Sequence, residues 1–199
     1  MTDSPSDTTE APSPLDTFAA ELATKVGAAR WTADYGTIHI YVNRDQWVAA
    51  ATTARDEADL GFFSWLSAVD WSKDVEVGEP AADVEDLEER YEILCRLASV
   101  NTSAAVILST SVAKDDAWLD TLVPVYAGAN WHEREAAEMF GVNFVGHPNL
   151  VKLYLPSGFE GHPLRKSFAL GARTVKPWPG TVDVEELPST TNVEAGEGS

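Results

Sequence analysis

The first sixty residues contain two stretches with helical spacing and two with strand spacing. Apolar side chains recur every three to four residues between 15 and 29, which predicts an amphipathic helix that packs on a sheet. Residues 31–34 and 37–42 lie on either side of a Tyr-Gly pair, and the second stretch alternates apolar and polar positions, which predicts a hairpin of two strands. A second helix is predicted over residues 45–58, with Asp45 as its N-cap.

Three further strands are predicted in the middle of the chain. The aromatic run at 62–71 and the stretches at 91–100 and 102–111 have the length and composition of strands. Residues 73–92 carry nine acids and two bases and are expected to form a solvated loop. Cys95 falls on the apolar side of its strand and is expected to be a core residue. The order helix, two strands, helix, three strands predicts a two-layer α+β domain with a mixed β-sheet.

Two short helices are expected to follow the sheet. Residues 115–126 have amphipathic spacing that is interrupted by a proline. Asn130 and Glu133 have the spacing of a capping box, in which each side chain bonds the backbone N–H of the other residue. Gly141 suits the left-handed position that ends a helix, so a helix of about three turns is predicted between Asn130 and Gly141.

The carboxyl-terminal third combines apolar side chains with a composition that disfavours regular structure. Residues 141–180 contain six glycines and five prolines, yet they also carry many Leu, Phe and Tyr side chains. Side chains as apolar as these are expected to be shielded from water by other protein surfaces. This predicts an extended irregular arm that lies on a partner protein as well as on its own domain. The predicted division is a disordered acidic tail at 1–14, an α+β domain at 15–127, a helix and docking arm at 128–180, and an acidic tail at 181–199.

Charge and cysteine content exclude several classes of function. The 199 residues carry a formal net charge of −18, which repels a nucleic-acid backbone and an anionic lipid surface. A single cysteine cannot form an intramolecular disulfide or supply the thiolates of an iron–sulfur cluster. Residues 130–176 hold six bases and four acids, which favours docking on a complementary surface, although a solvated strip is the alternative. The amino-terminal residues lack a signal-peptide pattern, so a cytoplasmic location is expected.

Candidate metal ligands are sparse in this sequence. His132 begins a stretch that resembles a zinc-binding helix, but Ala136 occupies the position at which that motif needs its second histidine. His147 and His162 each lie between a glycine and a proline, and together with Glu160 they could form a three-ligand site. We favour the alternative that each imidazole bonds a backbone carbonyl or a carboxylate.

Other catalytic patterns are weak or missing. Glu135 and Glu138 lie three residues apart on the predicted helix, and a carboxylate pair of this kind could serve in acid–base chemistry. Ion pairs with arginines of a neighbouring subunit are the interpretation we favour for them. The sequence has no glycine-rich phosphate loop and no nucleophile elbow, so an autonomous enzyme is not expected.

Three blocks near the carboxyl end carry a resemblance to a known family. They are Glu133-Arg134-Glu135, Met139-Phe140-Gly141 and the run from Glu160 to Lys166. Together these blocks resemble the C subunit, also called the 30 kDa-type subunit, of the proton-pumping NADH-quinone oxidoreductase, respiratory complex I.

This resemblance implies a structural subunit that binds no cofactor itself. It implies that iron–sulfur clusters, FMN and quinone are bound by partner subunits, and that the complex couples electron transfer from NADH to quinone with proton translocation. The partners it implies are other complex I subunits, chiefly the quinone-cavity (D) subunit and the terminal-cluster (B) subunit. It places the chain on the cytoplasmic side of the cell membrane as a peripheral protein. An equivalent subunit of a membrane-bound hydrogenase-type complex is the alternative.

The matching blocks also give the residues expected at subunit interfaces. The basic members are expected to bind carboxylates across the interface or within the arm, and Phe140, Leu164 and Phe168 to fill pockets. An independent metalloenzyme built on the two histidines and a free-standing regulatory binding domain are the rival classes. The expected interface residues are Glu133, Arg134, Glu135, Glu138, Met139, Phe140, His147, Glu160, His162, Pro163, Leu164, Arg165, Lys166 and Phe168.

Overall fold

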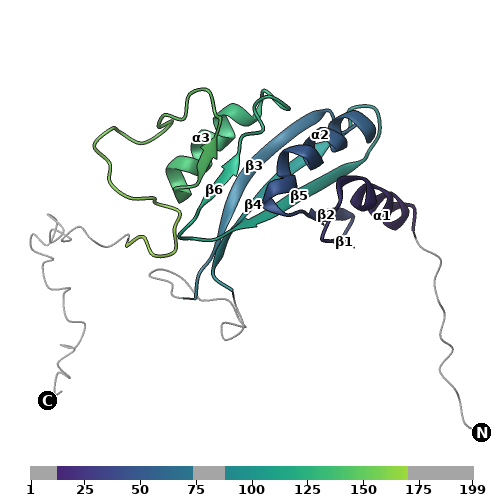
Figure 1. Cartoon of the computed structure of the whole chain (residues 1–199), viewed down its shortest axis with the longest axis horizontal. Helices are drawn as coiled ribbons and strands as arrows, with labels where there is room; N and C mark the ends of the chain where they lie inside the picture. Colours follow the sequence, from purple (N-terminus) through teal and green to yellow (C-terminus); the bar gives the residue numbers. More distant parts are fainter. Residues whose placement is uncertain (1–12, 74–87, 170–199) are drawn as a thin grey trace, which may run out of the picture. The chain divides into compact units, whose positions relative to one another are not determined.

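The computed structural model in Figure 1 describes residues 13–73 and 88–169 of the chain. The residues up to Phe168 belong to one unit, and Ala169 begins a second one. Most of the predicted amino-terminal tail, most of the acidic stretch between 73 and 92, and all of the predicted carboxyl-terminal tail lie outside the described residues.

The described residues form α-helices, a short 3-10 helix and strands in the following order. The elements are α1 (Pro14–Val26), β1 (Arg30–Asp34), β2 (Thr37–Tyr41), η1 (Arg44–Gln46), α2 (Trp47–Glu57), β3 (Phe62–Trp71), β4 (Arg90–Ala98), β5 (Ala105–Val112), β6 (Trp118–Asp120), α3 (Ala129–Phe140) and β7 (Asn143–Val145).

A five-stranded mixed sheet organises the amino-terminal part. Its strand order is β1-β2-β5-β4-β3, with β2 and β5 parallel and the other neighbours antiparallel. The hairpin between β1 and β2 turns at Tyr35 and Gly36, which both have positive φ, as a two-residue hairpin loop requires. The predicted two-layer α+β class with a mixed sheet is confirmed.

Helices α1 and α2 pack on one face of the sheet, and α2 lies in front of the strands in Figure 1. Helix α1 begins at a capping box formed by Ser13 and Asp16. The core between the layers contains Trp47, Ile40 and Cys95, all fully buried, which confirms the core role predicted for the cysteine. Neither α1 nor α2 packs on the other face of the sheet.

Two local predictions in this part of the chain are wrong. Asp45 does not cap α2, because it lies inside η1, a 3-10 turn that leads directly into the helix. Residues 115–126 form β6 and turns instead of a helix, because β6 pairs in parallel with β7, and local spacing does not reveal that distant partner. The expected acidic loop also ends earlier than predicted, since β4 already begins at Arg90.

Helix α3 ends as predicted but begins differently. Gly141 follows its last residue with a φ of 76°, which is the left-handed conformation expected there. The predicted capping box is wrong, because Gly128 occupies the N-cap position and no side chain caps the helix. Glu133 cannot close the box, since its carboxylate binds elsewhere in the fold.

Candidate functional site

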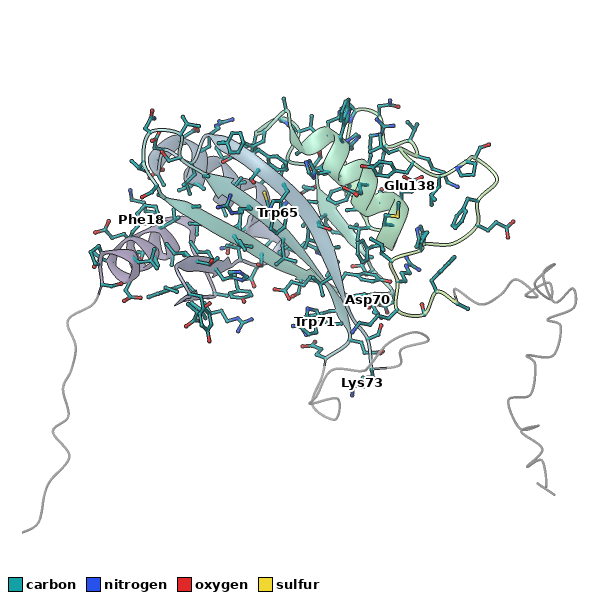
Figure 2. The ribbon with its side chains drawn as sticks, turned by 180° about the vertical axis from the view of Figure 1, so that it is seen from behind. Phe18, Trp65, Asp70, Trp71, Lys73 and Glu138 are labelled. Atoms are coloured by element: carbon teal, nitrogen blue, oxygen red, sulfur yellow. The ribbon has the colours of Figure 1, made fainter. Side chains whose placement is uncertain are left out.

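Helix α3 directs its charged side chains to two different places. Glu133 points into the protein, whereas Arg134 and Glu138 bind the irregular segment 146–168, which we call the arm. Glu138 is labelled in Figure 2, where the arm passes close to the helix. The first of the three matching blocks, Glu133-Arg134-Glu135, is therefore divided between core and arm.

Glu133 is a fully buried carboxylate that joins α3 to the segment after β6. Its Oε1 accepts a hydrogen bond from the Leu122 backbone N–H at 2.6 Å, and its Oε2 accepts one from the Thr121 hydroxyl. Nε2 of His147 lies 4.0 Å from Oε2. Burial raises the pKa of Glu133 to about 7, although the bonds from Thr121 and Leu122 act in the opposite direction.

Glu138 binds the backbone of the arm. Its carboxylate accepts hydrogen bonds from the N–H groups of Leu153, Tyr154 and Leu155, at 3.0, 2.9 and 2.7 Å. Burial of this side chain favours a higher pKa, but the three N–H donors outweigh that effect and lower the pKa of Glu138. The proposed ion pairing of this residue with an arginine has no counterpart among the described residues.

Arg134 and Lys152 bind carbonyl groups of the same segment. The Arg134 guanidinium donates to the carbonyls of Val151 and Lys152, at 2.8 and 3.0 Å. The Lys152 ammonium in turn donates to the Phe159 carbonyl at 2.7 Å. An irregular segment cannot pair its own backbone groups, so these side chains supply the missing partners.

The carboxyl end of α3 is closed by residues from the end of the arm. Arg165 Nε donates to the Phe140 carbonyl at 2.6 Å, and His162 Nδ1 donates to the Glu138 carbonyl at 2.8 Å. The last carbonyls of a helix lack partners within the helix, and these two side chains provide them. Gly141 leaves room for both, because a Cβ at this position would lie 2.6 Å from His162 Nε2.

A second anchor holds the arm to the edge of the sheet. Asp70, at the end of β3 and labelled in Figure 2, is 4% exposed and forms an ion pair with Lys114 at 2.7 Å. It also accepts hydrogen bonds from the Ser72 hydroxyl at 2.7 Å and from the backbone N–H of Lys166 at 2.9 Å. Sequence reasoning missed Asp70 and Lys114, since they lie far from the arm along the chain.

The two Gly-His-Pro histidines bind backbone carbonyls, as the favoured interpretation predicted. His147 Nε2 donates to the Asn130 carbonyl at 3.0 Å, and its Nδ1 accepts from the Asn149 N–H at 3.0 Å. His162 binds the Glu138 carbonyl at the end of α3. Within residues 13–73 and 88–169, no group of three or more His, Cys, Asp and Glu side chains is arranged to hold a metal ion.

The basic residues of the expected interface do not bind carboxylates within the described part of the chain. Arg134 and Arg165 bind carbonyls instead, and Lys166 contributes only its backbone N–H to Asp70. For these three residues, carboxylate partners across a subunit interface therefore remain a prediction.

The remaining members of the expected set differ in their surroundings. Phe140 is 6% exposed and belongs to the core, and Phe168 stacks on Phe159 with ring centroids 6.0 Å apart. Leu164 is 53% exposed. Met139 packs partly against the core, Pro163 is half-buried, and neither Glu135 nor Glu160 has a side-chain partner in the described residues.

A helix crosses a bilayer only if it is both long and apolar enough. None of the helices in residues 13–73 and 88–169 combines the length and the apolarity that a membrane crossing needs.

Fold and site together define an α+β scaffold whose charged signature residues hold an irregular arm in place. Residues 40–174 match the family model described as respiratory-chain NADH dehydrogenase, 30 Kd subunit. The chain belongs to this family, as the sequence blocks predicted.

Curated relatives agree with this assignment. The chain is 34% identical over 142 residues to the C subunit of NADH-quinone oxidoreductase from Roseiflexus sp., covering 70% of this chain and 74% of the relative. It is 32% identical to the C subunit from Agrobacterium fabrum, covering 77% of this chain and 72% of the relative. It is 38% identical over 110 residues to the C/D subunit of NADH-quinone oxidoreductase from Pectobacterium atrosepticum, covering 55% of this chain but only 17% of that longer protein.

Solved structures share the fold at lower sequence identity. A trypsin-resistant fragment of Nqo5 matches with a TM-score of 0.51 and 20% identity, covering 66% of this chain and 96% of the fragment. A chain of the membrane-bound sulfane sulfur reductase, an archaeal respiratory membrane complex, matches with a TM-score of 0.63 and 20% identity, covering 78% of this chain and 86% of that chain.

Proposed function

We propose that this chain is a non-catalytic structural subunit of the peripheral arm of NADH-quinone oxidoreductase. In this proposal the complex transfers electrons from NADH through iron–sulfur clusters to quinone and couples that transfer to proton translocation. FMN, the iron–sulfur clusters and quinone are bound by partner subunits. The chain is peripheral and lies on the cytoplasmic side of the membrane. Family membership and the relatives named as C subunits support this proposal.

The observation that carries the proposal is the contrast between backbone and side chains in the arm. The backbone is fixed by Arg134 and Glu138, so the arm has a defined path. Three of its large apolar side chains are nevertheless exposed: Val151, Tyr154 and Leu164, by 52, 61 and 53%. An ordered segment that exposes large apolar side chains is typical of a protein-interaction site.

The quinone-cavity subunit is the partner for which the relatives give separate support. Relatives named as C/D subunits contain the matched region as 17% of a longer chain, and their name indicates that the C and D subunits share one polypeptide. Two subunits that are joined in one polypeptide are expected to be neighbours when they are separate chains. The terminal-cluster subunit is proposed as the second neighbour on the family resemblance.

The sulfane sulfur reductase match supports a second candidate, the equivalent subunit of a related membrane complex. That match has the higher TM-score of the two structures, but at 20% identity it reports the fold alone. The relatives that are 32 to 34% identical over more than two thirds of their length are C subunits of the oxidoreductase, so we rank that function first.

Co-purification from cells that make the whole complex tests the proposal. A tagged full-length chain is expected to recover the quinone-cavity and terminal-cluster subunits from solubilised membranes. Tyr154→Glu together with Leu164→Glu should reduce this recovery at least tenfold and lower NADH-quinone activity of the membranes in parallel. Val100→Glu is the matched control, because Val100 is 77% exposed and lies outside the arm.

Folding of the purified variants is checked by circular dichroism, because the substituted side chains are exposed and should leave the fold intact. Unchanged recovery of both subunits with the arm variant would contradict the proposed docking role. Recovery of hydrogenase-type or sulfur reductase subunits in place of these two partners would favour the second candidate.

A further inference from the structure

The face of the five-stranded sheet that α1 and α2 leave uncovered carries large apolar side chains. The two-residue period of the strands places them opposite the core residues Leu66, Cys95 and Leu108. Figure 2 views the sheet from this side and shows Trp65 and Trp71 along β3. We call this surface the aromatic face; it consists of Tyr41, Trp65, Val69, Trp71, Leu94 and Ile107.

These side chains are shielded from water only in part. None of the six belongs to the hydrophobic core or packs against it. Val69 is 37% exposed, and the other five are half-buried. Six partly exposed apolar side chains on one described sheet face, interspersed with Ser67, Arg96 and Glu92, indicate an interaction site.

Three arginines surround the aromatic face without a carboxylate partner among the described residues. The Arg30 guanidinium lies 3.7 Å from the centre of the Tyr41 ring, and that of Arg90 lies 5.5 Å from the centre of the Trp71 ring. Arg96 lies on β4 between Trp65 of β3 and Ile107 of β5, and donates to the Ser64 hydroxyl at 3.4 Å. Three guanidinium groups without an ion pair to a described carboxylate are unexpected on one face of a chain of net charge −18.

Two carboxylates of the described strands, Asp34 and Glu92, also lie on this face. Glu92 is 8% exposed and accepts a hydrogen bond from Trp71 Nε1 at 2.7 Å. It therefore shields none of the three guanidinium groups by direct contact. Arginine and aromatic side chains together are the residue types enriched at the centres of protein interfaces.

A groove of about 610 Å³ continues the aromatic face at the ends of β2 and β5. Two arginines and two glutamates line this groove together: Arg30, Arg90, Glu88 and Glu89. An incoming carboxylate at this groove could accept hydrogen bonds from the Arg30 and Arg90 guanidinium groups.

We propose that the aromatic face docks an acidic segment of another subunit of the assembly. Apolar side chains of that segment pack on Trp65 and Trp71, and its carboxylates bind the three arginines. This inference rests on the proposed function, which supplies the assembly, but it uses a surface separate from the arm. Charge complementarity selects the partner, because an acidic segment gains ion pairs with guanidinium groups that bind no carboxylate among the described residues.

Photo-cross-linking in the assembled complex tests this docking surface. A benzoylphenylalanine replaces Leu94 at the centre of the aromatic face, and Glu21 on the exposed side of α1 serves as the control position. The expected product joins residue 94 to another subunit, within a stretch that contains at least two Asp or Glu residues, as identified by mass spectrometry. The control position should not give that product.

Charge reversal then tests the role of the arginines. Arg90→Glu is expected to lower the cross-link yield at least fivefold, whereas Lys25→Glu, an equal charge change at an exposed residue of α1, should leave it unchanged. Replacing the cross-linked carboxylates of the partner by arginine should restore the yield with Arg90→Glu. In the complex with unaltered arginines, the yield should also fall as salt is raised, which keeps the test valid if Arg90→Glu fails to fold.

Several outcomes would overturn the proposal. They are a cross-link to this chain's own residues, a cross-linked stretch without carboxylates, no product above the control, and a yield that is independent of salt. If the quinone-cavity and terminal-cluster subunits still co-purify in these cases, the proposed function stands and only the second surface is rejected. Failure of co-purification with the unaltered chain would reject the proposed function itself.

Discussion

Replacing Glu138 by glutamine is expected to loosen the arm without unfolding the domain. The carboxylate accepts three backbone N–H groups, two at Oε2 and one at Oε1. A glutamine can keep one oxygen in place, but its NH₂ group cannot accept, so at least one of these partly buried N–H groups loses its partner. Loss of a charge-assisted bond of this kind costs about 1.5–3 kcal/mol.

Amide hydrogen exchange measures this cost directly. A change of that size corresponds to exchange that is about tenfold to a hundredfold faster at the amides of Leu153, Tyr154 and Leu155. Glu135→Gln is the matched control, because this residue is on the same helix and has no side-chain partner in the described residues; its effect should stay within about 0.5 kcal/mol. Equal protection of these amides in both variants would refute the reasoning.

The same carboxylate should make the arm sensitive to acid. The pKa of Glu138 is lower in the folded chain than its ordinary value of 4.5. Its contribution to stability is therefore fully present at neutral pH and is lost as the pH falls through the folded value. Exchange at the three amides should accelerate over that acidic range in the natural chain and change less with pH in Glu138→Gln.

Substitutions of Glu133 and Gly141 test the buried side and the carboxyl end of α3. Glu133 has its pKa raised from 4.5 to about 7, so the free energy of unfolding should fall by roughly 3 kcal/mol as the pH rises between those values. Chemical denaturation of Glu133→Gln should show this slope removed, and an unchanged slope would assign it to another group. Gly141→Ala should lower stability by more than about 1–2 kcal/mol, because the left-handed backbone alone costs that much and the new Cβ would meet His162 and Arg165. Gly61→Ala, which meets nothing within 4 Å, should stay within about 0.5 kcal/mol, and similar melting temperatures for the two glycine variants would contradict the packing argument.

The strands and helices of the sheet domain could be predicted because their signals are local. The two-residue period of β4 put Cys95 in the core, and the positive φ at Gly141 follows from a glycine after an apolar helix. Predictions that depended on one element in isolation were less successful. Residues 118–120 form a strand only because residues 143–145 lie beside them, and no local pattern reports that pairing.

The candidate site was predictable in its residues but not in their partners. The set of residues expected at subunit interfaces included Glu133, Arg134 and Glu138, and the Gly-His-Pro context indicated that the histidines bind carbonyls. Glu133 has the sequence spacing of a capping box, but its buried carboxylate accepts a hydrogen bond from the Leu122 backbone N–H instead. A tertiary contact of this kind overrides helix-capping preference, because an unpaired carboxylate in the core would cost more than an uncapped helix end.

Helix α3 acts as a template for a segment that cannot pair its own backbone groups. A carboxylate binds three N–H groups of the arm, a guanidinium binds two of its carbonyls, and the end of the arm returns to cap the helix. Substitutions at Arg134 or Glu138 should therefore impair assembly by changing the path of the arm. Substitutions at Tyr154 or Leu164 should impair it by changing the exposed surface. The two routes are distinguishable in the isolated chain, because only the first increases hydrogen exchange in the arm.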